Sequence, residues 1–564
     1  MSEIKEDVIR AYALENAIKY NGKANFGSVL SGLFSQGLKK SQIKEYSSKI
    51  NEVINETNKL EIETQKKEFE KLKNLINKRE ERVGLPELPN AKKGKVVMRF
   101  APFPSGAIHL GNSRPLILND EYAKIYDGKF LLIIDDTIGS EEKPISPESY
   151  KLIEEDARWL NCKFDEVLYK SDRISEHYKY AEELIKKGYM YVCSCNAESF
   201  RELKLQKKEC PCRNNLSEKN LELWKKMFDK KQAPEGSYVV RLKTDMSYPD
   251  PAFRDRVMFK ISDRPHPRRG TEFRVYPTME FSWAIDNHFW KITHAIRGVE
   301  LDIEGKVEEF IRKILNWDNP VIINNGHLIL EGIKLSKSKG IREVKSGSYF
   351  GWDDPRLWSL QSLKARGIQP QAIREFIISQ GVKKSNTSVP VDILYKINKK
   401  YIEQSKRYFF VENPVKIKIL SSPELNVKIP LHPNQEMGFK EYKTSQEFLV
   451  SKEDYENFES GNYRFMHLFN FKAFKKNNSE LLSFSYISTE PEPNLNVKYL
   501  HWLNANQNNI KVEIIMTDGS IKEGLAEPEI QNLKEGEIIQ FERFGFVRLN
   551  KKNKEKYKFF FTHK

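Results

Sequence analysis

Between Lys95 and Thr137, a strand, a turn rich in proline and glycine, a helix and a second strand follow one another. The second strand, Phe130–Ile134, is wholly apolar, which is typical of parallel sheets covered on both faces. The apolar spacing from Leu116 to Tyr126 predicts the helix, and Gly128 ends it. A buried strand–helix–strand unit predicts a doubly wound, Rossmann-like α/β fold. In such folds ligands bind at the carboxyl ends of the strands, where the turn and Asp135-Asp136 fall.

The turn itself reads RFAPFPSGAIHLGN from Arg99 to Asn112. Its prolines stiffen the exit from the strand, and Gly111 removes a side chain where a flat base would lie on the backbone. His109 can donate to phosphate oxygens whether it is neutral or charged. A lone HxG would indicate only a strand-to-helix loop with a buried histidine, whereas the complete string favours a nucleotide site. The candidate nucleotide-binding residues of the turn are Pro102, Ser105, Gly106, His109, Gly111 and Asn112.

A second motif, KLSKSKG, begins at Lys334 and contains Lys337 and Ser336, which is a further candidate nucleotide-binding residue. The two lysines flank the serine closely enough for a compact loop to bring both ammonium groups to a triphosphate. Positioned cations of this kind stabilise the charge that develops on an α-phosphate and on leaving pyrophosphate. Alone, the string indicates a solvated basic loop, but together with the first turn it predicts adenylate chemistry.

Composition narrows the class of protein further. The chain has 564 residues, 39% of them apolar and 31% charged, so we expect a folded globular protein with several domains. No run of about 18 apolar residues is present, which excludes a membrane helix, and the N-terminus MSEIKEDVIR lacks a secretory pattern. We therefore expect a cytoplasmic protein. The net charge of +15 suits a polyanion such as nucleic acid, but a general richness in lysine would explain it equally well.

The two motifs together resemble the signatures of class I aminoacyl-tRNA synthetases, usually written HIGH and KMSKS. Further strings, in matching order, make the whole chain similar to archaeal-type glutamyl-tRNA synthetases and more distantly to glutaminyl-tRNA synthetases. These strings are Leu118–Tyr122, Tyr191–Cys195, Tyr276-Pro277, Thr293–Gly298, Gly351–Arg356 and Phe541–Val547. The resemblance implies ATP-dependent activation of L-glutamate, with Mg²⁺ accompanying ATP, and transfer to the terminal 2′-OH of tRNA(Glu). It leaves open whether tRNA(Gln) is charged as well.

The resemblance also assigns a domain organisation to the sequence. The expected regions are a helical N-terminal domain and linker (1–90), the first half of the catalytic domain (91–190), an acceptor-end-binding insertion (191–288), the second half of the catalytic domain with the lysine loop (289–344), a helical stem-contact region (345–407) and anticodon-binding β-barrels (408–564). Short alternating segments such as Val415–Leu420 and Ile538–Phe541 support the barrels. We expect a monomer with no membrane partner.

Resemblance implies that His109, Lys334 and Lys337 stabilise the transition state of adenylation. A glutamate substrate brings a second carboxylate that must be paired when it leaves water. Arg99 and Arg297 are the two candidate guanidinium groups.

The remaining substrate residues also come from the family pattern, in which Asp135 pairs with the substrate ammonium and Tyr276 lines the pocket. Arg297 matches a position that is arginine in glutamate enzymes and neutral in glutamine ones, so it favours glutamate.

Several positions depart from the family pattern. Asn112 replaces the second histidine of the first signature, Ile133 stands where arginine is common, and Leu301 replaces a histidine. Pro115 is tolerable only near the first turn of a helix. Two alternatives therefore stay open, a glutaminyl-tRNA synthetase and a catalytically silent tRNA-binding scaffold.

Four of the five cysteines form the pattern CxC–x14–CxC, at Cys193, Cys195, Cys210 and Cys212. This loop is long enough to return four thiolates to one tetrahedral zinc ion, but the spacing fits four reduced thiols equally well. Similar placement in some glutamyl-tRNA synthetases favours a structural zinc.

Overall fold

The computed structural model describes residues 4–20, 22–76, 84–138, 143–333, 337–475 and 482–564. The chain divides into two compact units, Met1–Gly84 and Leu85–Lys564. Among these described residues no helix is long and apolar enough to cross a lipid bilayer.

The N-terminal unit is helical, as the resemblance implies. Its helices are α1 (Glu6–Lys19), α2 (Phe26–Ser35), α3 (Ile43–Thr57) and α4 (Ile62–Leu72). Apolar residues at three- and four-residue spacing, such as Ile50, Val53 and Ile54 of α3, form its core together with Ile9 and Val29.

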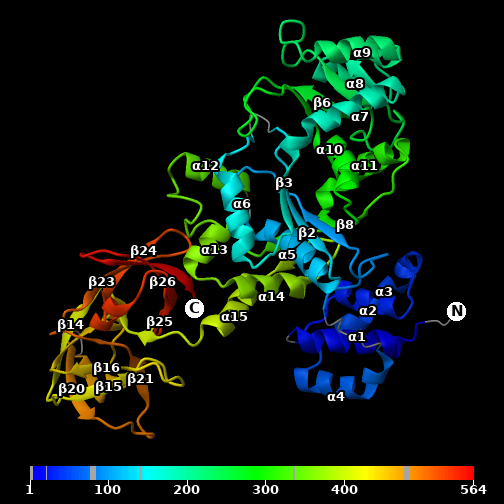
Figure 1. Ribbon diagram of the computed structural model, residues 1–564. Helices are drawn as coiled ribbons and strands as arrows, with labels where there is room; N and C mark the ends of the chain where they lie inside the picture. The colour runs from blue at the N-terminus through cyan, green and yellow to red at the C-terminus, as the bar shows by residue number, and fades with distance from the viewer. Residues whose placement is uncertain (1–3, 21, 77–83, 139–142, 334–336, 476–481) are drawn as a thin grey trace. The chain divides into compact units, whose positions relative to one another are not determined.

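The centre of the second unit is built from parallel strands that alternate with helices (Figure 1). Three of them pair in the order β1 (Val97–Phe100), β2 (Lys129–Ile134) and β3 (Glu166–Tyr169), with α5 (Leu110–Ile125) and α6 (Glu148–Trp159) as the connections. A further parallel pair, β8 (His294–Gly298) and β9 (Val321–Asn325), lies beside β1, where the Val97 and Thr293 backbones are hydrogen-bonded. The predicted parallel α/β fold is confirmed, and the carboxyl ends of these strands face one region.

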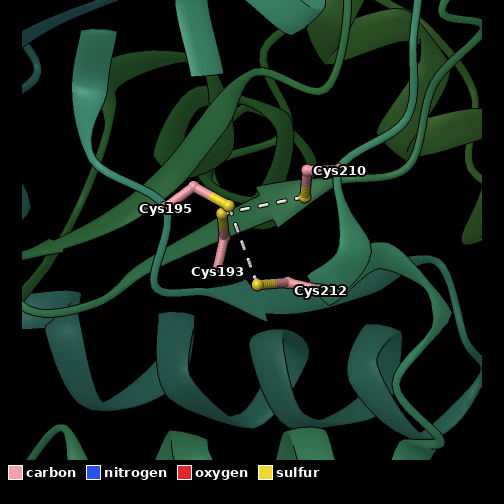
Figure 2. A group of neighbouring side chains, drawn as sticks. All are labelled: Cys193, Cys195, Cys210 and Cys212. Carbon is pink, nitrogen blue, oxygen red and sulfur yellow. Dashed lines mark hydrogen bonds between the residues drawn. The ribbon is translucent and has the colours of Figure 1, made fainter. Parts of the chain in front are cut away.

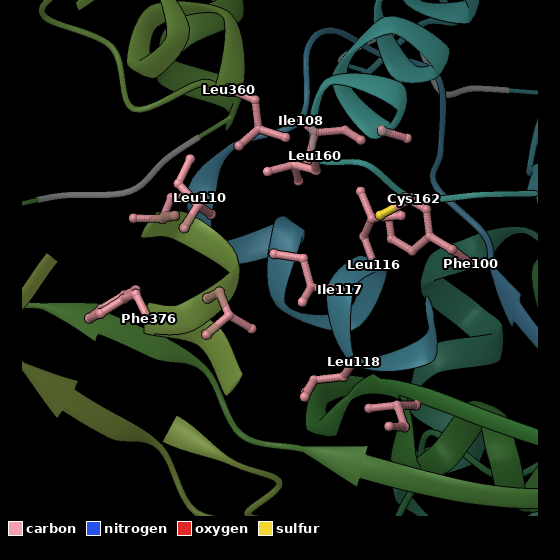
Figure 3. Packing of buried hydrophobic residues seen from close by; sticks show 14 of the residues in the cluster. Phe100, Ile108, Leu110, Leu116, Ile117, Leu118, Leu160, Cys162, Leu360 and Phe376 are labelled. Atoms are coloured by element: carbon pink, nitrogen blue, oxygen red, sulfur yellow. The ribbon is translucent and has the colours of Figure 1, made fainter. Parts of the chain in front are cut away.

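Helix α5 is buried within the main core of this unit. Its residues Leu116, Ile117 and Leu118 pack with Phe100 of β1 and Phe376 of α14 (Pro370–Gln380) (Figure 3). Burial on all sides explains why the helix has almost no amphipathic pattern. Pro115 is the sixth residue of α5, so it lies beyond the first turn and has no N–H to donate to the Gly111 carbonyl.

The insertion forms an antiparallel sheet with helices around it. The sheet has the order β4 (Met190–Cys193), β5 (Val239–Leu242), β6 (Val257–Ile261) and β7 (Val275–Pro277). The associated helices are η3 (Lys170–Arg173), α7 (Ile174–Lys186), α8 (Ala197–Leu205), α9 (Ser217–Lys226), α10 (Met279–Phe289) and α11 (Asp302–Ile314). Helices α10 and α11 pack on each other and lead the chain back to the parallel strands.

A mainly helical segment connects the parallel sheet to the C-terminal region. Its elements are β10 (Leu328–Leu330), α12 (Lys337–Lys345), α13 (Leu360–Arg366), α14 (Pro370–Gln380), β11 (Thr387–Val389) and α15 (Val391–Ile402). Backbone bonds join this segment to the first motif, because Leu110 N–H donates to Trp358 O and Leu360 N–H donates to Ile108 O.

In its described residues, the C-terminal region forms two seven-stranded sheets, as the alternating segments predict. The first has the order β12 (Arg407–Tyr408), β25 (Ile538–Phe541), β26 (Gly545–Lys552), β27 (Tyr557–His563), β23 (Ile510–Ile515), β24 (Ile521–Ala526) and β13 (Phe410–Glu412). Because only Phe409 separates β12 from β13, the two edges of this sheet meet and it closes nearly into a barrel.

The second sheet has its own aromatic core, which includes Phe448, Phe465 and Trp502. Its order is β21 (Val497–Leu500), β18 (Gly461–Phe465), β19 (Asn470–Lys475), β20 (Leu482–Ser488), β14 (Val415–Leu420), β17 (Glu447–Val450) and β22 (Leu503–Asn504), with a separate hairpin of β15 (Asn426–Pro430) and β16 (Phe439–Lys443).

Candidate active site

The first motif forms the turn between β1 and α5. Its backbone is bonded to the segment between β2 and α6, since Asp135 N–H donates to Pro102 O and Ser146 N–H donates to Pro104 O. Gly106 has φ 152°, and a Cβ there would collide with the Trp352 ring. This glycine is therefore required both by the backbone and by the ring packed against it. Ser105 is buried beside it.

His109 caps the N-terminus of α5. Its Nδ1 accepts a hydrogen bond from Asn112 N–H at 3.3 Å, which leaves the ring proton of the neutral imidazole on Nε2. The first amides of α5 carry the partial positive charge of a helix N-terminus, a ready position for phosphate. Asn112, the departure from the family histidine, retains this backbone role.

A cavity of about 460 Å³ opens at this helix end. It is lined by His109, Gly111, Asn112, Arg114, Pro115, Arg297, Gly298, Glu300, Asn325, Gly326, His327, Leu328, Ile329, Leu330 and Ile333. The lining ends at Ile333, one residue before the lysine loop. Lys334 and Ser336 lie outside the described residues, and Lys337 begins α12 with its side chain outside them as well.

A second cavity of about 260 Å³ adjoins the first. The two share Asn112, Pro115, Arg297, Gly298 and Glu300. The predicted residues Arg99, Pro102 and Asp135 line the second cavity together with Trp283, whereas Ser105 and Gly106 line neither. The first motif thus contributes to two adjacent spaces, one at the helix end and one at the strand ends.

Arg99, near the end of β1, is a buried guanidinium whose hydrogen bonds are incomplete. Its Nε donates to Asn287 Oδ1 at 2.8 Å, and its Cζ lies 3.6 Å from the centre of the Trp283 ring. Its Nη2 is buried without a hydrogen-bond partner. Burial lowers the pKa of Arg99 to about 9, and the nearby charges partly oppose one another, with Glu308 raising and Arg297 lowering it. An anionic ligand group would satisfy this guanidinium.

Asp135, directly after β2, is already engaged by protein groups. Its Oδ1 lies 3.0 Å from Lys170 Nζ, and its Oδ2 accepts from Trp283 Nε1 at 3.0 Å. Its neighbour Asp136 accepts from Ser171 N–H and Oγ and from Tyr150. The parallel register of β2 and β3, which pairs Ile134 with Tyr169, brings these groups together.

Arg297, at the end of β8, is matched by a carboxylate. Its Nη1 donates to Glu308 of α11 at 2.6 Å, and its Nη2 donates to Leu301 O at 3.2 Å. Glu308 is fully buried and also lies 3.8 Å from Arg312. Arg297 therefore lines both cavities as a guanidinium whose charge is already paired.

The structure separates Tyr276 from the other predicted substrate residues. It is fully buried on β7, its hydroxyl donates to Phe273 O, and it does not line the cavity. Ile133 packs with Trp283 and Ile292, so the position where the family has arginine is apolar here. Leu301 lines the strand-end cavity.

Lys170, Trp283, Asn287 and Glu308 were not among the residues predicted from the sequence. Only the position of Lys170, one residue after a strand, gave a signal that could have found it.

The four cysteines of the insertion converge at the end of β4 (Figure 2). Their sulfur atoms all lie within 4.8 Å of one another, with Cys193 and Cys210 at 3.9 Å and Cys195 and Cys212 at 3.9 Å. A tetrahedron of thiolates around zinc, with bonds of 2.3 Å, has edges of about 3.8 Å. The donor set and its spacing therefore fit a zinc ion.

Family comparisons agree with this geometry. The profile described as "tRNA synthetases class I (E and Q), catalytic domain" matches residues 95–404, and two profiles of the corresponding anti-codon binding domains match 405–487 and 479–550. The chain therefore belongs to the class I tRNA synthetases of the glutamate and glutamine group.

Relatives that match over their full length show to which family within this group the chain belongs. The chain is 41% identical over 577 residues to the glutamate–tRNA ligase of Pyrococcus furiosus, which covers 99% of this chain and 100% of that protein. It is 40% identical over 562 residues to the glutamate–tRNA ligase of Methanocaldococcus jannaschii, with 99% and 100% covered. Within its class, the chain belongs to the glutamate–tRNA ligase family.

Proposed function

We propose that this chain is a glutamate–tRNA ligase, which activates L-glutamate with ATP and transfers it to the terminal 2′-OH of tRNA(Glu). The observation that carries the proposal is the meeting of two cavities at Asn112, Pro115, Arg297, Gly298 and Glu300. One cavity lies at a helix N-terminus suited to phosphate, and the other offers a buried guanidinium suited to a carboxylate. The full-length similarity to glutamate–tRNA ligases supports the same function.

In the first step, an α-carboxylate oxygen of glutamate attacks the α-phosphorus of ATP, and the bond to the bridging oxygen breaks to release pyrophosphate. His109 and the amides at the start of α5 stabilise the negative charge that develops on the phosphate. Lys334 and Lys337 follow the cavity-lining Ile333 in the sequence, and we assign them to stabilise the same negative charge. Catalysis here is mainly positioning and electrostatic stabilisation.

Substrate recognition is assigned to groups of the smaller cavity. Arg99 Nη2 binds the side-chain carboxylate, and Asp135 retains lone pairs for the substrate ammonium. In the second step, the 2′-OH of the tRNA attacks the mixed anhydride and AMP leaves. The C-terminal sheets are assigned to the anticodon, and we extend the proposal to tRNA(Gln) as a second acceptor.

Two metal ions belong to the proposal. Mg²⁺ accompanies ATP and neutralises phosphate charge. Zinc is held by Cys193, Cys195, Cys210 and Cys212, where it stiffens the insertion and takes no part in the reaction. We place the enzyme in the cytoplasm as a monomer.

An ATP–pyrophosphate exchange assay tests the function. We expect exchange with glutamate, stimulated by tRNA(Glu), and none with glutamine. Exchange supported only by glutamine would contradict the substrate, and tRNA binding without any exchange would indicate a silent scaffold.

A further inference from the structure

Lys170 is a lysine with no exposed surface at the end of the sheet that holds the substrate cavity. It follows Tyr169, the last residue of β3, and the register of β3 with β2 sets it beside Asp135. Its Nζ lies 3.0 Å from Asp135 Oδ1 and 4.1 Å from the centre of the Trp283 ring. Taking an ammonium group out of water costs free energy, so a buried lysine needs a counter-charge. Its burial at a candidate site therefore calls for a functional explanation.

The counter-charge of Lys170 is the carboxylate assigned to the substrate ammonium. Asp135 has one oxygen at Lys170 and the other at Trp283 Nε1. Its negative charge is therefore matched before a ligand arrives. The same indole ring lies against Arg99, so Trp283 connects the two ends of the cavity.

Cations exceed carboxylates among the buried charges that act most strongly on Arg99. In the described part of the chain these are the carboxylates Glu308 and Asp135 and the cations Arg297 and Arg312, and Lys170 lies against Asp135 as a further buried cation. The next carboxylate behind Lys170, Asp286, is matched by Arg173 at 2.7 Å and bonded by His177. The cluster thus carries an excess of positive charge.

The unpaired hydrogen-bond donors agree with this excess. Arg99 Nη2, Arg297 Nε, both Nη atoms of Arg312 and Lys170 Nζ are buried without a hydrogen-bond partner. Since Arg297 already has Glu308 at 2.6 Å, the guanidinium with an unmatched charge at the cavity is Arg99.

We propose that Lys170 determines specificity as a positioning residue: by neutralising Asp135, it leaves the charge of Arg99 free to select an amino acid with a second carboxylate over the corresponding amide. This inference rests on the proposed function. Glutamate carries one more negative charge than glutamine and so offsets the excess, whereas the neutral amide leaves it unmatched. Charge interactions at such a buried site are stronger than in water. If Lys170 were neutral, Asp135 would offset Arg99 and the preference for the acid would fall.

The test compares Lys170→Gln and Lys170→Met, which remove the charge, with Lys170→Arg, which keeps it. The matched control is Lys440→Gln, because Lys440 is equally buried and paired with Glu527 at 2.9 Å, far along the chain in the β region. The readouts are the KM of glutamate and of ATP in tRNA-dependent exchange, the inhibition constant of glutamine, and the thermal midpoint.

We expect Lys170→Gln and Lys170→Met to raise the glutamate KM by about tenfold or more, an effect of about 1.4 kcal/mol. The ATP KM and the glutamine inhibition constant should stay within about twofold, Lys170→Arg should retain most of the preference, and Lys440→Gln should lose thermal stability only. Equal losses of glutamate and glutamine affinity, or a loss in Lys440→Gln as well, would overturn the inference.

Direct binding separates this inference from the function. Isothermal titration of glutamate and glutamine into the same full-length variants measures the preference even if no exchange occurs. Absence of exchange in the unsubstituted protein would contradict the ligase function, whereas an unchanged ratio of the two affinities in Lys170→Gln would contradict the role of Lys170.

Discussion

Among the described residues, two buried lysine–carboxylate pairs lie in different regions of the molecule, and they differ in how completely they are bonded. In the β region, Lys440 donates to both oxygens of Glu527 and to Arg407 O, and Glu527 accepts from Phe409 N–H. In the catalytic region, Lys170 has Asp135 at 3.0 Å but its Nζ makes no hydrogen bond, and a cavity adjoins the pair. The first pair is complete without a ligand, and the second is not. The unpaired donors beside the second pair, and not its burial alone, distinguish it as a candidate functional site.

The largest expected effect is the loss of stability when the completely bonded pair of Lys440 and Glu527 is broken. Lys440→Gln leaves Glu527 as a buried charge without its partner and should cost about 3–5 kcal/mol of unfolding free energy. Denaturant unfolding measures this loss. Lys416→Gln, which removes an exposed lysine from an ion pair of the same region, should change stability by about 0.5 kcal/mol or less. Equal effects of the two substitutions would show that the buried pair contributes no more than the exposed one.

Substitutions around the Lys170–Asp135 pair, which is incompletely bonded, should change activity more than stability. Arg99→Lys keeps the charge but loses the bond from Nε to Asn287 and the planar contact with Trp283. We expect kcat/KM for glutamate to fall by a factor that corresponds to about 1.5–3 kcal/mol of lost transition-state stabilisation, with the ATP KM nearly unchanged. Steady-state exchange kinetics measure both values, with Arg158→Lys on the exposed face of α6 as the control. A change below about twofold would mean that the charge alone suffices.

The turn next to Asp135 offers a smaller change in the same region. Gly106→Ala should destabilise the fold by about 1–3 kcal/mol, because φ is 152° and the new methyl group would meet Trp352. Gly188→Ala is the matched control, since its φ is 77° and nothing lies within 4 Å of a Cβ there. Unfolding curves that coincide for the two variants would show that the ring contact adds nothing to the backbone strain.

The smallest expected effect is a pH dependence in the β region. Burial lowers the pKa of His501 to about 4, and the charge of Arg543, which bonds Nδ1, lowers it too while Asp454 opposes them. The folded state therefore favours neutral His501, so this stability is present above the unfolded pKa of about 6.5 and is lost as the pH falls towards 4.

The loss should be about 1 kcal/mol between pH 6.5 and 5.5. Urea unfolding at both values measures it, and the same experiment on His501→Gln should show a smaller dependence. An identical dependence in that variant would assign the effect to other groups.

Much of the fold could be predicted because its elements follow local patterns. The apolar run Phe130–Ile134 lies within β2, and Val415–Leu420 and Ile538–Phe541 coincide with β14 and β25. Such segments are set by burial of alternating or continuous apolar side chains, which the sequence displays directly. The buried helix α5 was predicted from its apolar residues, although Pro115 lies further inside it than expected.

The predicted residues that line the cavities all stand in local strings of the sequence. Arg99, Pro102 and Asp135 line one cavity, His109 and Gly111 line the other, and Asn112 and Arg297 line both. Partners such as Lys170 and Glu308 depend on strand register and helix packing, which no local pattern encodes. The roles given to all the candidate site residues stay predictions. Lys334 and Ser336 lie outside the described residues, and so does the side chain of Lys337.

The backbone bonds between the first motif and the segment after Trp352 have a mechanical consequence. Ile108 and Leu110 are bonded to Leu360 and Trp358, so backbone hydrogen bonds link the start of α5 to the start of α13. At its other end α13 is fastened to the C-terminal strand, where Arg366 donates to Thr562 O at 3.1 Å. Helix α13 thus connects the nearly closed barrel to the N-terminus of α5, the end that we propose faces phosphate. If bound RNA displaced that barrel, α13 would transmit the displacement to this end of α5 without any change in the parallel sheet.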